Sequence, residues 1–145
     1  MMKKKILIID DEKSFTNILK LWFENTGEFK VLEENNALHG LTAARHFQPD
    51  LIVLDINMPD MSGGELASVI KEDPNLQDIP VIFLTGLINR QEERNIRGSF
   101  YVSKPVRMNH LLDCINTILR QSAGVAQQPS YATRRSVWNR RFAFN

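Results

Sequence analysis

Short apolar runs alternate with longer amphipathic stretches along most of this chain. The apolar runs have the length of strands, and two are nearly continuous runs of β-branched residues and leucine. That composition is typical of strands covered on both faces of a parallel sheet. We therefore predict five strands, at Ile6–Ile9, Val31–Leu32, Leu51–Leu54, Val81–Leu84 and Phe100–Val102.

Between these strands, apolar residues recur at the 3.6-residue period of an amphipathic helix. Gly63 and Gly64, which precede one such stripe, predict a flexible turn in front of that helix. Strands that alternate with helices predict an α/β fold, a doubly wound parallel sheet with helices on both faces. The clearest helical stripes run over Phe15–Trp22, Leu38–Ala44, Leu66–Ile70 and Leu111–Leu119.

The segment between Thr85 and Tyr101 has the weakest pattern. Its middle, Gln91–Asn95, is almost wholly polar, and few neighbouring positions could be buried. We expect a shortened, partly frayed fourth helix there.

Charge and composition change after residue 121. Residues 1–121 hold all 17 acidic residues and 14 of the 18 Lys and Arg, a net charge of −3, whereas residues 122–145 carry +4. We predict a domain over 1–121, followed over 122–145 by a linker and a basic, aromatic tail that is disordered or leads to an output domain.

Several classes of function are disfavoured by these numbers. No apolar run reaches the roughly 20 residues of a membrane span. The acidic body does not suit nucleic acid, and the tail is too short to form a helix-turn-helix, so we expect no sequence-specific DNA binding. A single cysteine, Cys114, suits a cytoplasmic protein and is expected to pack beside the last helical stripe.

Polar residues stand at the carboxyl ends of four predicted strands. Asp10 and Asp11 close the first strand, Asp55 the third and Thr85 the fourth, and Lys104 follows the fifth. Because the carboxyl ends of parallel strands meet at one edge of the sheet, we expect these side chains to lie close together.

Such a cluster has a definite chemistry. Crowded carboxylates raise one another's pKa unless a cation lies between them, and Mg²⁺ is the usual cation where a phosphoryl group completes the shell. Asp55 could then act as a nucleophile that forms an acyl phosphate, with Lys104 and Thr85 binding the phosphoryl oxygens. The alternative is that each acid merely ends a strand or opens a loop.

Four stretches of the sequence resemble the receiver domain of two-component response regulators, and in particular chemotaxis-type regulators. The resemblance covers roughly residues 3–121 and implies a flavodoxin-like sheet with strand order 2-1-3-4-5. The matching stretches are Ile-Leu-Ile-Ile-Asp-Asp-Glu at 6–12, Gln-Pro-Asp-Leu-Ile-Val-Leu-Asp-Ile-Asn-Met-Pro-Asp-Met-Ser-Gly at 48–63, Ile-Pro-Val-Ile-Phe-Leu-Thr-Gly at 79–86 and Tyr-Val-Ser-Lys-Pro-Val at 101–106.

The resemblance also implies roles for residues of the acidic cluster. Asp55 would accept a phosphoryl group from a sensor histidine kinase or a phosphotransfer protein. Mg²⁺ would be bound directly by Asp11 and Asp55, partly through water by Asp10, and by the backbone carbonyl of Asn57.

Lys104 would bind the phosphoryl group, and a cis peptide bond is implied before Pro105. Thr85 and Tyr101 would form the switch, in which Thr85 moves toward the phosphate and the Tyr101 ring turns into the vacated space. Only 19 positions separate Thr85 from Lys104, about one helical turn fewer than the family normally has. We expect the phosphorylation chemistry to survive this deletion and the output geometry to differ.

These expectations describe a signalling module that catalyses only its own phosphorylation and dephosphorylation, with a homodimer or a downstream output protein left open as partners. One alternative is a haloacid-dehalogenase-type phosphatase, although that family requires a second Asp where Asn57 stands. Another is a scaffold that works without phosphorylation. The three histidines, His39, His46 and His110, have no metal-ligand spacing among them.

Overall fold

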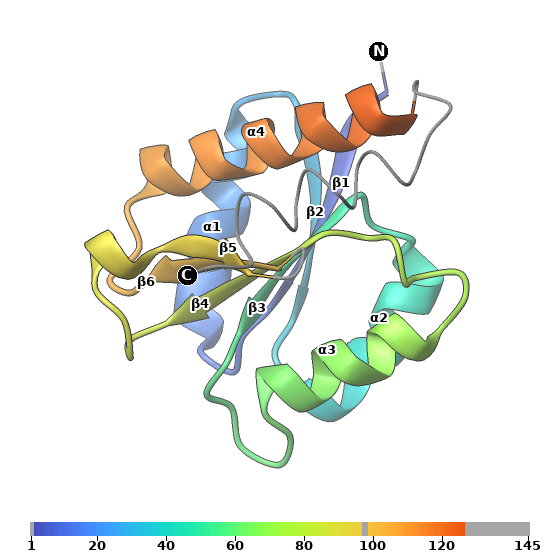
Figure 1. Cartoon of the computed structure of the whole chain (residues 1–145), viewed down its shortest axis with the longest axis vertical. Helices are drawn as coiled ribbons and strands as arrows, with labels where there is room; N and C mark the ends of the chain where they lie inside the picture. Colours follow the sequence, from blue (N-terminus) through green and yellow to red (C-terminus); the bar gives the residue numbers. More distant parts are fainter. Residues whose placement is uncertain (1, 97–98, 127–145) are drawn as a thin grey trace.

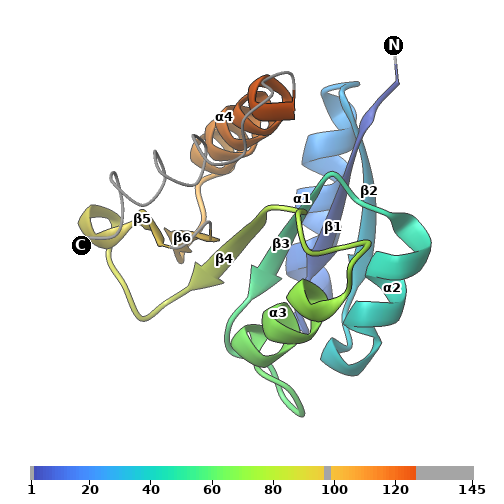
Figure 2. The same ribbon diagram turned by 45° about the vertical axis from the view of Figure 1, so that its right-hand side comes forward.

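The computed structural model describes residues 2–96 and 99–126, so residues 127–145 of the predicted tail lie outside the described residues. Its centre is a six-stranded sheet in the order β2-β1-β3-β4-β6-β5, which can be followed from right to left in Figure 2. The strands are β1 (Lys4–Ile9), β2 (Phe29–Glu34), β3 (Leu51–Asp55), β4 (Val81–Thr85), β5 (Arg94–Ile96) and β6 (Ser99–Ser103).

Five of these strands are parallel, with β6 as the fifth, and they confirm the predicted order 2-1-3-4-5. Every residue of β3 and of β4 is buried. This explains why their sequences are continuous apolar runs rather than an alternation of apolar and polar residues. The parallel register brings the carboxyl ends of β1, β3, β4 and β6 to one edge of the sheet.

Helices cover both faces of the sheet (Figure 1). Helices α1 (Lys13–Asn25) and α4 (Met108–Ala126) pack on one face, and α2 (Gly40–Phe47) and α3 (Gly63–Glu72) pack on the other, with the short 3₁₀ helix η1 (Ala37–His39) leading into α2. The doubly wound architecture predicted from the alternation of strands and helices is therefore confirmed.

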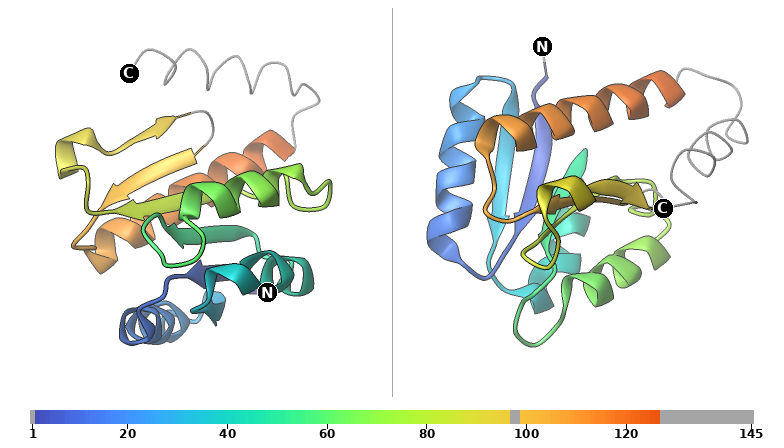
Figure 3. Two further views of the ribbon diagram at one scale, coloured as in Figure 1. Left: turned by 90° about the horizontal axis from the view of Figure 1, so that it is seen from below. Right: turned by 60° about the vertical axis from the view of Figure 1, so that its left-hand side comes forward.

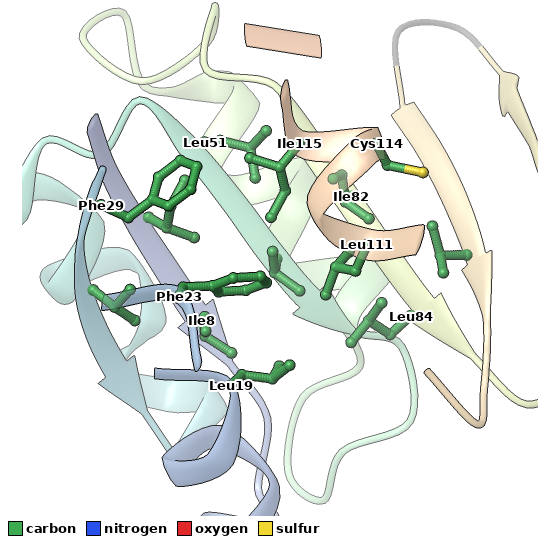
Figure 4. Close-up of a cluster of buried hydrophobic side chains, with 14 of the residues drawn as sticks. Ile8, Leu19, Phe23, Phe29, Leu51, Ile82, Leu84, Leu111, Cys114 and Ile115 are labelled. Carbon is green, nitrogen blue, oxygen red and sulfur yellow. The ribbon is translucent and has the colours of Figure 1, made fainter. Parts of the chain in front are cut away.

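Each helical layer seals its own hydrophobic core against the sheet. On the α1 and α4 face, Phe23 of α1 and Leu111 of α4 are fully buried over Ile8 and Ile82 of the sheet (Figure 4). Burying one such side chain contributes about 1.5–3 kcal/mol, so these cores fix the sheet whose edge carries the polar cluster.

The prediction of a shortened, partly frayed fourth helix between Thr85 and Tyr101 is wrong. Between β4 and β6 the described residues form the 3₁₀ turn η2 (Arg90–Glu92) and the short strand β5, which pairs antiparallel with β6 at the edge of the sheet (Figure 3). The polar run in this segment offers no apolar stripe that could pack a helix on the sheet. An edge strand needs only backbone hydrogen bonds on one side, which a polar sequence can supply.

Helix α4 continues to Ala126, five residues beyond the predicted domain boundary at residue 121. The division into a domain over 1–121 and a tail over 122–145 otherwise stays a prediction. Among the described residues, no helix is both long enough and apolar enough to cross a membrane.

Candidate functional site

Four strands deliver the predicted polar residues to one edge of the sheet. Asp10 and Asp11 directly follow β1, Asp55 and Thr85 are the last residues of β3 and β4, and Lys104 directly follows β6. The structure thus brings these five residues together, and the sheet topology alone accounts for their placement.

The three aspartates form a compact cluster. Asp10 and Asp55 are 1% and 4% exposed, whereas Asp11 is open to solvent. One carboxylate oxygen from each of the three lies within 4.8 Å of the others. They line a pocket of about 500 Å³ together with Glu12, Asn57, Gly86 and Lys104.

Lys104 lies between the two buried acids. Its Nζ is 3.2 Å from Asp10 Oδ2 and 3.2 Å from Asp55 Oδ1. The cation therefore meets one carboxylate from each of two strands, which partly offsets the cost of burying both.

The surroundings of Asp55, in which Asp10 and Lys104 are the charged neighbours, favour its neutral form. Burial, and then the charge of Asp10, raise the pKa of Asp55 above its ordinary value of 3.8, although Lys104 opposes both effects. For Lys104 itself, burial acts to lower the pKa, but the carboxylates of Asp10 and Asp55 outweigh it and raise the pKa. Three acids facing one lysine leave an excess of negative charge at the pocket.

The donor set of this pocket fits a hard divalent cation. Three carboxylates supply anionic oxygen ligands at close range, and an open pocket beside them leaves room for water and for a phosphoryl group. Burial and then the charge of Asp10 raise the pKa of Asp55, and a cation here would offset the second of these effects.

The backbone around Lys104 is fixed by short-range contacts. Its backbone N–H donates to Thr85 O at 2.8 Å, and the Lys104–Pro105 peptide bond is cis, as the family resemblance implied. The Nζ group lies 5.2 Å from the centroid of the Phe15 ring, a cation–π contact from α1.

Thr85 and Tyr101, the predicted switch pair, lie on neighbouring strands. Thr85 is buried, and its Oγ1 accepts a hydrogen bond from the backbone N–H of Leu87 at 3.0 Å, which leaves the hydroxyl proton free to donate. The half-buried Tyr101 ring stacks on Phe83 with centroids 5.0 Å apart. Phe83 precedes Thr85 by two residues, so the tyrosine ring and the threonine share one face of the sheet.

Asp55 is supported from the loop that follows it. The backbone N–H of Asn57 donates to Asp55 Oδ1 at 3.4 Å, a long hydrogen bond, and that of Gly63 donates to Ile56 O at 2.8 Å. A Cβ atom at Gly63 would lie only 2.3 Å from Asp55 O, so this close approach requires glycine.

Asn35 belongs to the site but was missed by the sequence analysis. Its Nδ2 donates to Asp10 O at 2.7 Å and to the Oγ1 of Thr16 at 2.9 Å, while the Thr16 hydroxyl donates to Glu33 Oε1 at 2.7 Å. These bonds tie the Asp10 turn to α1 and β2. A signal was present, because Asn35 directly follows the carboxyl end of β2 on the same edge.

The three histidines take no part in the pocket. His39 lies on the surface, 4.0 Å from Glu34, and His110 pairs with Glu93 at 2.6 Å. Cys114, a residue of α4, packs in the core between this helix and the sheet, as predicted.

Comparison with known proteins identifies the family. The family model of the response regulator receiver domain matches residues 6–116. The chain belongs to the response-regulator receiver family. Receiver domains are signalling domains rather than enzymes in the metabolic sense, and family membership favours this function over the haloacid-dehalogenase alternative.

Relatives and solved structures agree with this membership. The receiver is 31% identical over 121 residues to the polar-differentiation response regulator DivK of Brucella anthropi, a match that covers 81% of this chain and 98% of the relative. A CheY-like receiver domain protein from Methanospirillum hungatei has a TM-score of 0.73 at 26% identity, covering 85% of this chain and 98% of that one. The chemotaxis protein CheY4 of Vibrio cholerae shares the fold, with a TM-score of 0.71 at 22% identity and coverage of 81% and 99%.

Proposed function

We propose that this receiver accepts a phosphoryl group on Asp55 in the presence of Mg²⁺ and signals by a change of conformation. The observation that carries the proposal is the position of Lys104 Nζ, 3.2 Å from oxygens of both Asp10 and Asp55. A cation facing a buried carboxylate is the arrangement that stabilises charge on a phosphoryl group in transfer.

The transfer step is a displacement at phosphorus. An oxygen of the Asp55 carboxylate forms a bond to phosphorus as the bond from phosphorus to the donor breaks, and the donor leaves with the electron pair. The donor is a phosphohistidine of a sensor kinase or phosphotransfer protein. A small acyl phosphate such as acetyl phosphate can replace it and leaves as acetate.

Four groups would hold Mg²⁺ in this proposal: the carboxylates of Asp11 and Asp55, the Asp10 carboxylate partly through water, and the backbone carbonyl of Asn57. The bound ion supplies positive charge that screens the acids and the phosphoryl oxygens. Lys104 would bind a phosphoryl oxygen, and the Thr85 hydroxyl would donate its proton to another. The second reaction of the domain would be hydrolysis of the acyl phosphate, in which water takes the phosphoryl group from Asp55.

The switch proposal involves the two residues on β4 and β6. Thr85 would leave its hydrogen bond with Leu87 when its hydroxyl turns to the phosphoryl group. Tyr101 would then turn into the space that Thr85 leaves, which shifts the population between two states of this edge. A second copy of the chain or a downstream output protein would recognise the shifted state. The cytoplasmic location also stays a proposal.

The function is tested by intact mass after incubation with acetyl phosphate. We predict a gain of one phosphoryl group with Mg²⁺ and no gain when the metal is removed by a chelator, because the acids then repel the incoming phosphate. Asp11→Asn is expected to need a higher Mg²⁺ concentration for the same gain, since it removes one charged ligand. Equal labelling with and without chelator would contradict the metal assignment.

Lys104→Met tests the basic partner. The thioether keeps much of the volume of the side chain but removes the charge. We expect both the rate of phosphoryl uptake and the rate of its loss to fall on the order of 10-fold or more, because Lys104 stabilises charge in both directions. The rates are followed by quenched-flow or timed mass measurements. Rates equal to those of the unmodified protein would exclude Lys104 as the phosphate partner.

A further inference from the structure

A second polar cluster lies outside the pocket, around Glu93, directly between η2 and β5. One oxygen of its carboxylate accepts hydrogen bonds from the backbone N–H and the hydroxyl of Ser103, at 2.8 and 2.6 Å. The other oxygen lies 2.6 Å from Nε2 of His110, in the first turn of α4. Glu93 thus joins the edge segment, the end of β6 and the start of α4.

The bond from the Ser103 backbone N–H to Glu93 continues the hydrogen bonding of β6 beyond the first residue of β5, Arg94. Along a strand, successive N–H groups point to opposite neighbours, and the N–H of Lys104 points to Thr85 of β4. The N–H of Ser103 therefore points to the other side, where the antiparallel ladder stops at the pair Arg94 and Tyr101. The Glu93 carboxylate occupies the place of the missing backbone acceptor.

The Glu93 side chain is 7% exposed and is held as a carboxylate. Burial acts to raise its pKa, but the hydrogen bonds from Ser103 and His110 outweigh burial and lower the pKa below the ordinary value of 4.5. The charge is therefore present throughout the neutral range. A neutral side chain at this position would lose the attraction of His110 and weaken both bonds to Ser103.

We propose that Glu93 is a positioning residue for phosphoryl transfer: it holds the Ser103–Lys104 turn so that the Lys104 ammonium faces Asp10 and Asp55. Ser103 immediately precedes Lys104, and His110 follows it by six residues, so Glu93 fixes the chain on both sides of the lysine. The proposal rests on the function proposed above for Lys104. It assigns a role to the η2–β5 segment that stands where a fourth helix was expected.

Cys114 is a built-in reporter for this cluster. Its Sγ lies 3.8 Å from His110 Nε2, and it is the only cysteine of the chain. Burial, together with the charges of Glu93 and Asp113, raises the pKa of the thiol to about 11. Figure 4 shows the Cys114 sulfur directed from α4 toward β6. Thiol labelling should therefore be slow near neutral pH and should accelerate when the Glu93–His110 contact is lost.

The test compares Glu93→Gln with a matched control, Glu72→Gln, at an exposed position near the end of α3. For each protein, the rate of uptake from acetyl phosphate is measured by mass, Mg²⁺ affinity by calorimetric titration, and Cys114 labelling with a maleimide. We expect Glu93→Gln to slow uptake on the order of 10-fold, because a lysine displaced by a fraction of an ångström stabilises the transferring group less well. Mg²⁺ affinity should not fall, since Lys104 is not a ligand and its charge competes with the metal for Asp10 and Asp55, and labelling should accelerate.

His110→Gln serves as the second variant if Glu93→Gln does not fold, and a smaller slowing of uptake in the same direction is expected. Uptake at the unmodified rate in these variants would overturn the proposal. A parallel fall of uptake and Mg²⁺ affinity would also overturn it, because that result indicates general loosening of the fold. Failure of the unmodified chain to take up any phosphoryl group would instead refute the proposed function on which this inference rests.

Discussion

Asp55→Asn is expected to abolish the gain of a phosphoryl group from acetyl phosphate. The amide that replaces the carboxylate is a poor nucleophile and cannot form an acyl phosphate, while its shape fits the same buried position. The fold should tolerate the change. Burial and Asp10 raise the pKa of Asp55, so the charged form is the costly one in the folded protein, and a neutral amide removes that cost. Intact mass and a thermal unfolding curve measure the two effects.

The matched control for this variant is Asp60→Asn, in the same loop. Asp60 is exposed and has a φ of 70°, a conformation that asparagine adopts as readily as aspartate. The control should be labelled to the same extent as the unmodified protein. Undiminished labelling of Asp55→Asn would show that another residue accepts the phosphoryl group, and the site assignment would fail.

Gly63→Ala is expected to have the largest effect on stability. Its new Cβ would lie 2.3 Å from Asp55 O and 2.8 Å from the Cα of Ile56, and both are backbone atoms of the strand end that carries the nucleophile. Backbone atoms cannot turn aside as a flexible side chain can, so α3 or the end of β3 must shift. Overpacking of this kind costs on the order of 3 kcal/mol, which lowers Tm by roughly 10 °C in a domain of this size.

Gly64→Ala is the natural control because it makes the same chemical change one residue later. A Cβ there meets only the Ser62 side chain, at 3.9 Å, and the backbone is already helical. Alanine in a helix is favoured over glycine by up to about 1 kcal/mol, so Tm should stay or rise. Both proteins are measured by calorimetry. Equal unfolding temperatures for the two variants would contradict the close approach of Gly63 to the backbone of Asp55.

The acidic pocket could be predicted from the sequence because it follows from topology. The four strands β1, β3, β4 and β6 are parallel, so their carboxyl ends lie at one edge of the sheet. The residues at those ends meet there independently of the loop conformations: Asp10, Asp55, Thr85 and Lys104. Asn35 follows from the same rule, although its strand, β2, has a weaker apolar pattern.

The start of α3 was predicted less well. Gly63 and Gly64 favoured a flexible turn, but both lie in the first turn of the helix. The signal that identifies this start is local. Ser62 and Glu65 form a capping box, in which each side chain accepts a hydrogen bond from the other's backbone, at 3.1 and 3.2 Å.

The edge segment could not be predicted from local pattern at all. Its polar residues fit a frayed helix as well as a strand, and the choice is made by contacts with distant parts of the chain. Glu93 bonds to Ser103, ten residues later, and to His110, seventeen residues later. A window of neighbouring residues contains neither partner, so propensity and periodicity carry no information about these bonds.

The most direct measurement is to locate the phosphoryl group. After incubation with acetyl phosphate and Mg²⁺, borohydride reduction converts an aspartyl phosphate to homoserine, which peptide mass mapping then places in the sequence. Homoserine is expected at position 55 alone, with none in a sample treated with chelator. Homoserine at another aspartate, or a stable phosphoryl group on a histidine or serine, would contradict the assignment of this pocket.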